Sequence, residues 1–239
     1  MITIRKSDER GRGDRGWLKS RFSFSFADYY DPAHMGFRAL RVINDDVIAA
    51  GTGFGPHGHR DMEILTYVLE GRLLHRDSMG ERHILGPNEV QAMTAGTGIV
   101  HSEYNASDDE PVHSIQIWIV PEAEDFQPSY QQFAFSPAEK SGRFRLLAGP
   151  TWAAANAQET MATIHQEAWL YVSSLDWGQM VRHQLASGRH AWAQVVRGRV
   201  TINGYALEEG DAAAFSDEFE VLASASDGEG GEFLLFDLA

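Results

Sequence analysis

Tyr67-Val68-Leu69-Glu70-Gly71-Arg72-Leu73 and Gln194-Val195-Val196-Arg197-Gly198-Arg199-Val200 repeat one pattern in the two halves of the 239-residue chain. Each stretch is typical of a strand, a glycine turn and a second strand. A further glycine follows each copy, at Gly86 and Gly210, and precedes another short β-type segment. Because strands without covering helices bury one face by closing into a barrel or jelly roll, the pattern predicts an all-β protein built as a duplicated barrel.

Short segments with β-type alternation continue outside these two stretches. They predict strands that include residues 39–43, 46–50, 63–70, 73–77 and 112–120. Between Pro121 and Pro150 the alternation weakens, and proline there removes backbone donors. We therefore predict a domain crossing in this region, with a first domain at 1–125 and a second at 126–239.

Composition and charge exclude several classes of protein. Lys and Arg total 20 against 34 Asp and Glu, which gives a formal net charge of −14. Such a charge repels phosphate backbones and acidic lipid surfaces, so we expect neither direct nucleic-acid binding nor membrane association. No apolar run reaches the ~18 residues of a membrane span and the N-terminal residues lack a signal-type apolar core, so a cytoplasmic location is expected.

Two short histidine motifs predict a metal site in the first half of the chain. The chain has no cysteine, which leaves His, Asp and Glu as candidate ligands. His57 and His59 point the same way if their segment is extended, and so do His101 and Glu103. An isolated pair of this kind is more often solvated than ligating, but two such pairs on neighbouring segments bring together three imidazoles and a carboxylate. This set suits Fe, Zn, Cu, Ni or Mn.

The other histidines lack this spacing, and we interpret them as surface groups or hydrogen-bonded core groups: His34, His75, His83, His113, His165, His183 and His190. Some apolar residues near the motifs are candidates for the walls of a flat pocket, although core packing explains each equally well: Phe54, Met93, Ile115 and Trp118.

The spacing of these motifs resembles that of a known family. Gly51-x5-His57-x-His59-x3-Glu63 followed by Gly71 resembles the first cupin motif, and Gly96-x-Gly98-x2-His101-x3-Asn105 resembles the second. Several further stretches resemble pirin and its bacterial quercetinase relatives, and together they cover residues 16–121: Phe22-Ser23-Phe24-Ser25-Phe26-Ala27, Tyr29-Tyr30-Asp31-Pro32, Met35-Gly36-Phe37 and Leu40-Arg41-Val42-Ile43-Asn44-Asp45.

The resemblance implies two cupin domains and one metal ion held by His57, His59, His101 and Glu103, with Glu63 outside the ligand set. It implies Fe(II) as the ion, with Zn, Cu, Ni, Mn and Co as alternatives. In the second copy, Gln184, Ala186 and Ala225 stand where His57, His59 and His101 stand in the first, so no second metal site is expected.

The resemblance also implies two different functions. One is quercetin 2,3-dioxygenase activity, in which a small aromatic substrate and O₂ react at the metal and Glu103 is the candidate catalytic base. The other is a non-enzymatic, metal-binding transcriptional cofactor that acts through protein partners. A structural cupin with an idle metal is a third interpretation.

Overall fold

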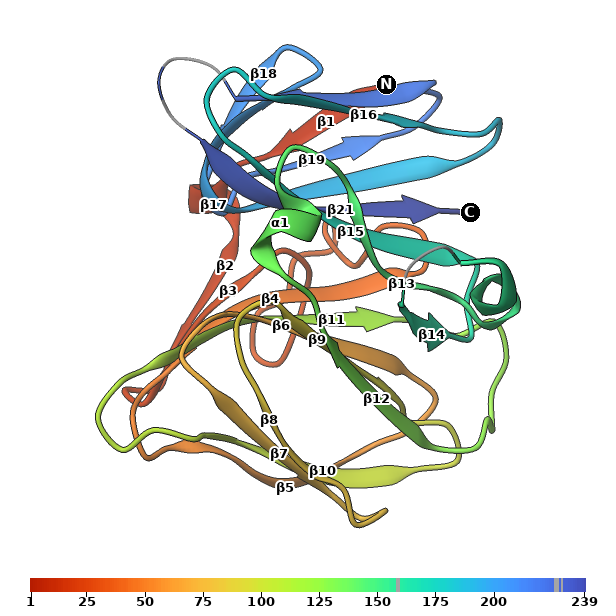
Figure 1. The fold of residues 1–239 in the computed structure, drawn as a ribbon. Helices are drawn as coiled ribbons and strands as arrows, with labels where there is room; N and C mark the ends of the chain where they lie inside the picture. Colours follow the sequence, from red (N-terminus) through yellow and green to blue (C-terminus); the bar gives the residue numbers. More distant parts are fainter. Residues whose placement is uncertain (158–159, 226–227, 229) are drawn as a thin grey trace. The chain divides into compact units, whose positions relative to one another are not determined.

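The chain folds into two compact units of antiparallel strands (Figure 1). The computed structural model describes residues 1–157, 160–225, 228 and 230–239. The larger unit comprises Gly11–Phe135 and Ala162–Gln166, and the smaller unit comprises Met1–Arg10, Ser136–Met161 and Glu167–Ala239. No helix among the described residues is long and apolar enough to cross a lipid bilayer.

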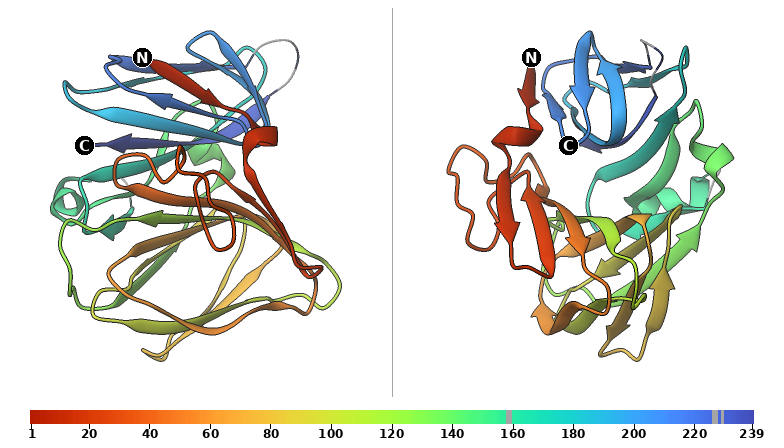
Figure 2. Two further views of the ribbon diagram at one scale, coloured as in Figure 1. Left: turned by 180° about the vertical axis from the view of Figure 1, so that it is seen from behind. Right: turned by 90° about the vertical axis from the view of Figure 1, so that its left-hand side faces the viewer.

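Two sheets make up the larger unit, and Figures 1 and 2 show them facing each other across its interior. The first is a seven-stranded sheet in the order β12-β9-β6-β11-β4-β3-β2, and the second is a four-stranded sheet in the order β5-β10-β7-β8. The strands of these two sheets are β2 (Gly11–Asp14), β3 (Leu18–Phe22), β4 (Leu40–Ile48), β5 (Gly53–His59), β6 (Glu63–Glu70), β7 (Leu73–Asp77), β8 (Arg82–Leu85), β9 (Glu89–Thr94), β10 (Ile99–Asn105), β11 (Val112–Ile119) and β12 (Ser129–Ala134). The larger unit also contains the short strand β14 (Ala162–Ile164), which belongs to neither sheet.

The smaller unit contains one main run of paired strands, β1-β19-β17-β21-β15-β13, while β20 pairs with β16 and β17, and β18 pairs with β17. Its elements are β1 (Ile2–Arg5), η1 (Ser7–Glu9), α1 (Pro137–Lys140), β13 (Arg145–Pro150), η2 (Thr151–Asn156), β15 (Ala168–Leu175), β16 (Met180–Gln184), β17 (His190–Ile202), β18 (Tyr205–Glu208), β19 (Ala212–Phe215), β20 (Glu220–Ser224) and β21 (Gly231–Leu238). The all-β prediction is confirmed, whereas the domain boundary at 125/126 stays a prediction.

The glycines of the repeated stretch share a structural role in the two units. Gly71 and Gly198 have positive φ angles of 74° and 63°. A Cβ atom on Gly71 would lie 2.5 Å from the carbonyl oxygen of Pro111, and one on Gly198 would lie 2.2 Å from that of Gly230. Only glycine combines the left-handed backbone with so close an approach, which explains why the pattern recurs.

Each unit has its own apolar core. In the larger unit one core cluster is formed by Leu18, Ile48, Val68, Leu73, Leu85 and Val112. A second cluster, with Ile64, Met93, Ala95 and Ile99, lies near the histidine motifs. In the smaller unit the buried apolar side chains come chiefly from β17, β19, β20 and β21. The alternating residues of facing strands supply both cores, as expected for antiparallel sheets.

Several strands differ from their predicted extents. Residues 39–43 and 46–50 were expected to be separate strands, but β4 is continuous through Asn44 and Asp45. Asp45 lies on the face of β4 opposite to Asn44, where it accepts a hydrogen bond from His113 at 2.6 Å that stabilises it within the strand. The strand β5 was not expected, because Gly53, Gly55, Pro56 and Gly58 fall within it.

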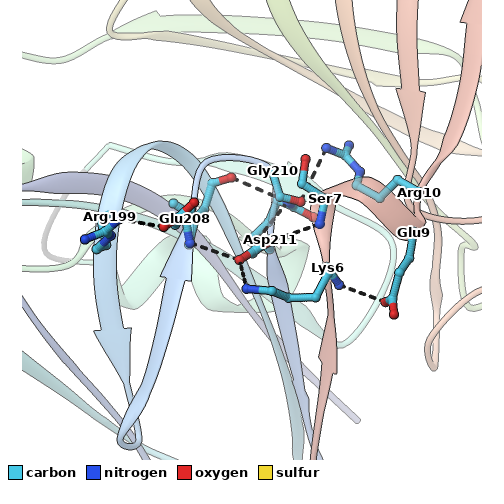
Figure 3. Close-up of polar contacts among 10 residues, drawn as sticks. Lys6, Ser7, Glu9, Arg10, Arg199, Glu208, Gly210 and Asp211 are labelled. Atoms are coloured by element: carbon cyan, nitrogen blue, oxygen red, sulfur yellow. Dashed lines mark hydrogen bonds and ion pairs between the residues drawn. The ribbon is translucent and has the colours of Figure 1, made fainter.

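One buried carboxylate anchors the N-terminal segment within the smaller unit (Figure 3). Asp211 is 3% exposed, and it accepts hydrogen bonds from the backbone N–H groups of Ser7 at 2.7 Å and Glu208 at 3.0 Å. It also forms an ion pair with the half-exposed Lys6. Asp211 therefore ties β1 and η1 to the turn that precedes β19.

Replacing Asp211 with Ala should destabilise the protein by about 2–4 kcal/mol, because two buried N–H donors lose their acceptor. The matched control is Lys6→Ala, which removes only the partly exposed ion pair and should cost less than about 1 kcal/mol. Urea denaturation followed by fluorescence measures both changes. Equal losses in the two variants would contradict this role of Asp211.

Candidate metal centre

The register between β5 and β10 brings the two histidine motifs together. His57 lies opposite His101, and an irregularity in the pairing follows before Glu103, which lies opposite Phe54. Three residues of β5 thus span the distance of two residues of β10, as in a β-bulge. The bulge falls at Gly55 and Pro56, and proline has no N–H to contribute to the ladder.

Three imidazole rings converge at this point. One ligand-type atom from each of His57, His59 and His101 lies within 4.8 Å of the others. The Nε2 atoms of His57 and His101 are 3.0 Å apart. The ring centroids of His59 and His101 are separated by 4.8 Å. The structure therefore brings these three residues together, as the sequence predicted.

The surroundings of the histidines leave nitrogen lone pairs available for a cation. His57 Nδ1–H donates to the carbonyl oxygen of Gly55 at 2.8 Å, which leaves the lone pair on Nε2, the atom that faces His101. Burial, followed by the charge of His57, lowers the pKa of His59 to about 4. Burial, followed by the charges of His57, His59 and His75, lowers the pKa of His101 to about 2. His59 and His101 are therefore neutral at pH 7.

Glu103 supplies a buried carboxylate beside these rings. Its side chain is 2% exposed, and its Oε2 atom accepts a hydrogen bond from Gln116 Nε2 at 2.8 Å. Gln116 is itself held by Trp118, whose Nε1–H donates to Gln116 Oε1 at 3.2 Å. Glu103 Oε1 has no hydrogen-bond partner among the described residues. Burial, opposed by the hydrogen bond from Gln116, raises the pKa of Glu103 to about 7.

These residues fit a divalent transition metal. Three imidazoles and one carboxylate form a donor set used for such ions, and Glu103 Oε1 is a buried acceptor without a hydrogen-bond partner among the described residues. Glu103 is grouped in space with His101 and His75, whose ligand-type atoms also lie within 4.8 Å of one another. The two groups share His101.

The sequence suggested that His75 is a surface group or a hydrogen-bonded core group, and it gave no sign that this residue lies beside Glu103. His75 is fully buried on β7, directly opposite Glu103 of β10. Its Nε2 lies 3.0 Å from Asp77 Oδ2, while its Nδ1 has no partner among the described residues. The side chain thus faces the metal centre. Only the pairing of β7 with β10 places it there, and no local motif marks it.

Glu63 is engaged away from the histidines. Its buried carboxylate accepts hydrogen bonds from Thr94 Oγ1 at 2.9 Å and from His165 Nδ1 at 3.1 Å. Burial raises its pKa, while the hydrogen bonds from Thr94 and His165 oppose this shift. Glu63 therefore joins the segment Ala162–Gln166 to the rest of the larger unit.

A cavity of about 230 Å³ reaches the metal centre, and His57, His59 and Glu103 form part of its wall. Phe54 and Trp118 line it, as the sequence suggested. Met93 and Ile115 do not: Met93 packs in an apolar core cluster, and Ile115 lies on the face of β11 opposite to Gln116 and Trp118. The remaining apolar walls come from Leu18, Phe22 and Phe26.

The equivalent positions of the smaller unit bring no such group together. Gln184 Nε2 donates to Glu220 Oε2 at 2.9 Å. Ala186 and Ala225 carry no ligand atom. His183, one residue before Gln184, is instead paired with Asp237 at 2.7 Å.

Comparison with known proteins places the chain in a family with this architecture. A family model described as Pirin matches residues 3–119, and one described as "Quercetinase C-terminal cupin domain" matches residues 151–238. The chain belongs to the pirin family, and its fold is that of two cupin domains.

Two relatives match along essentially their full lengths. A protein named quercetin 2,3-dioxygenase from Escherichia coli K12 is 48% identical over 238 residues, covering 100% of this chain and 99% of the relative. A pirin-like protein from Caulobacter vibrioides is 38% identical over 239 residues, covering all of both chains. The crystal structure of the bacterial pirin YhhW from Escherichia coli in complex with nickel(II) is 48% identical, with a TM-score of 0.91 and coverage of 100% and 99%.

Metal binding near pH 6 should release about one proton from Glu103. With its pKa raised to about 7, this carboxyl group is mostly protonated at pH 6, whereas His59 and His101 are already neutral because their pKa values are about 4 and 2. A cation requires the carboxylate form, so affinity should fall as the pH drops below 7. Titration calorimetry in two buffers of different ionisation enthalpy measures the released protons.

The variant Glu103→Gln should release about one proton fewer than the wild type at the same pH, because the amide has no proton to give up. Equal proton release by the two proteins would contradict the assignment of the raised pKa to Glu103.

Proposed function

We propose that the protein is a metal-dependent dioxygenase that opens the central ring of quercetin, or of a related flavonol or enolic phenol, with O₂. The observation that carries this proposal is the direct contact of the cavity with His57, His59 and Glu103, since an oxygenase needs substrate access to its metal centre. The relatives named quercetin 2,3-dioxygenase support the same reaction.

His57, His59, His101 and Glu103 would hold the ion. We propose Fe(II) as the resident metal, while the nickel(II) complex of the 48% identical YhhW supports a site that accepts more than one divalent ion. When bound, such an ion supplies Lewis-acid and redox chemistry at the end of the cavity. Three histidine nitrogens and one Glu103 oxygen would occupy only part of the coordination sphere of such an ion, which would leave room for a substrate.

Glu103 is the proposed base for the substrate hydroxyl. Its Oε1 has no hydrogen-bond partner among the described residues, so this oxygen can serve either the ion or the substrate hydroxyl, whose proton it would accept. Gln116 holds the other oxygen, so the carboxylate keeps its orientation while Oε1 acts. Trp118 in turn fixes the amide of Gln116.

The apolar walls orient a flat substrate and exclude water. Phe26 lies edge-on to Trp118 with ring centroids 5.3 Å apart, and Trp118 lies edge-on to His59 at 4.9 Å. Phe54 packs edge-on against Trp17 at 5.2 Å. Aromatic side chains locked by such contacts form a rigid, low-dielectric pocket around the reacting group.

Metal analysis combined with O₂ uptake tests the proposed reaction. Protein purified without added metal should contain one transition metal ion, and quercetin should cause O₂ uptake that depends on that ion. Reconstitution of metal-free protein with Fe, Cu, Ni, Mn and Co identifies which ions support turnover. Stoichiometric metal without uptake for any of these ions would reject the dioxygenase and favour the regulatory role that the resemblance also implies.

The substitution Glu103→Gln should lower kcat by about 10²-fold or more, because general base catalysis contributes roughly 10²–10⁴-fold. Glu63→Gln is the matched control, since Glu63 is another buried carboxylate of the larger unit but binds Thr94 and His165 instead of lining the cavity. Its kcat should stay near the wild-type value. Full turnover by metal-loaded Glu103→Gln would reject the proposed base.

A further inference from the structure

The β4 wall of the cavity contains a buried polar side chain with one acceptor atom that none of the described residues bonds. Asn44 is 2% exposed and lines the cavity, and its Oδ1 has no hydrogen-bond partner among the described residues. Nearly all buried polar atoms in folded proteins have a partner, and an unsatisfied one destabilises the native state. An acceptor kept free in this way is suited to a ligand.

Strand register places Asn44 beside the group that holds Glu103. Asn44 lies directly opposite Gln116 in the pairing of β4 with β11, which brings the two Cβ atoms to about 5 Å. Gln116 donates to Glu103 Oε2 at 2.8 Å. A substrate whose hydroxyl faces Glu103 therefore has its neighbouring atoms next to Asn44.

The neighbouring polar residues of this wall differ from Asn44. Asp46 faces the same side of β4 and also lines the cavity, but its Oδ1 accepts a hydrogen bond from Ser20 at 2.5 Å. Ser20 lies opposite Asp46 on β3, so the pair is built into the sheet. Unlike Asp46 Oδ1, Asn44 Oδ1 is a buried acceptor without a hydrogen-bond partner among the described residues.

We propose that Asn44 determines substrate specificity by accepting a hydrogen bond from a second hydroxyl group adjacent to the reacting hydroxyl, so that the preferred substrates are catechols and ene-diols. The first hydroxyl gives its proton to Glu103, and its neighbour donates to Asn44 Oδ1. This inference rests on the proposed function and narrows its substrates to the enolic phenols that carry a second hydroxyl, because the reacting hydroxyl of quercetin lies beside a carbonyl oxygen that cannot donate to Asn44. A cavity of about 230 Å³ lies below the ~300–1,000 Å³ usual for drug-sized ligands, which favours such single-ring compounds over flavonols.

Three small probes separate this hydrogen bond from other sources of affinity. Catechol has a hydroxyl beside the reacting one, 2-methoxyphenol has an oxygen there that cannot donate, and phenol has none. Calorimetric titration of the metal-loaded protein without O₂ should give the tightest binding for catechol. In Asn44→Leu the catechol affinity should fall about tenfold, because one hydrogen bond to a buried acceptor is lost, while the affinities for the other two probes stay within about twofold.

The stability of the variant distinguishes a ligand-binding residue from a structural one. Leucine removes an unsatisfied buried acceptor with little change in volume, so Asn44→Leu should melt at the same temperature as the wild type or about 2–4 °C higher. A lower melting temperature with unchanged catechol binding would show that Asn44 serves the fold and would overturn the proposal. If leucine prevents folding, Asn44→Met supplies an unbranched apolar side chain for the same test.

A control variant and a metal-free titration complete the experiment. Ser20→Ala is the matched control in the same cavity, because the Ser20 hydroxyl is already bonded to Asp46, and it should keep the catechol preference. Repeating the titrations on metal-free protein shows whether the preference depends on chelation. If Asn44→Leu retains the full preference for catechol, or if all three probes weaken equally, the proposal fails.

The test of Asn44 and the test of the dioxygenase reaction can fail independently of each other. Catechol binding that depends on Asn44, without O₂ uptake for any metal, would reject the dioxygenase but keep Asn44 as the determinant of ligand choice. O₂ uptake with quercetin together with catechol binding that is unaffected by Asn44→Leu would keep the dioxygenase and reject the inference.

Discussion

The pairing of β5 with β10 is the constraint on which the metal centre depends. Each strand contributes two candidate ligands at alternate positions, and only one register sets His57 opposite His101. A shift of one strand by one residue would turn its pair of candidate ligands to the other face of the sheet, away from the pair on the neighbouring strand. The irregularity at Gly55 and Pro56 then moves Glu103 opposite Phe54, and both residues line the cavity. The same strand β10 pairs with β7 on its other side, which adds His75 to the surroundings of Glu103.

The interior of the larger unit contains a row of buried and half-buried polar side chains. Register aligns Gln91, Thr66, Gln116 and Asn44 in one row across β9, β6, β11 and β4. His75, His101 and Glu103 come from the opposite sheet. Polar atoms without partners, such as His75 Nδ1 and Asn44 Oδ1, lower stability, and folded proteins retain such groups mainly where function requires them. The smaller unit, with a core drawn largely from β17 and β21, lacks a comparable gathering of histidines among its described residues.

The sequence predicted the parts of this site that depend on local spacing. Strand periodicity was enough to pair His57 with His59 and His101 with Glu103, and the repeated glycine pattern was enough to predict two all-β copies. His75, Gln116 and Asn44 were beyond its reach, because each joins the site through pairing between strands far apart in the chain. The strand β5 was not predicted, since glycine and proline suggest turns whether or not a neighbouring strand supplies hydrogen bonds. Glu63, which the resemblance left outside the ligand set, accepts hydrogen bonds from Thr94 and His165 instead.

The attachment of β1 to β19 sets a condition on the synthesis of the chain. Ile2 pairs with Phe215, and Asp211 fastens the segment that follows β1. At ~5–20 residues per second, a ribosome takes roughly 10–40 s to make the partner strand after the first residues emerge. Throughout that time β1 is an open strand edge exposed to other nascent chains. Arg5, Lys6 and Asp8, at and just after its C-terminal end, are charged residues of the kind that discourages edge-to-edge association. They would therefore reduce aggregation through β1 until β19 has been synthesised.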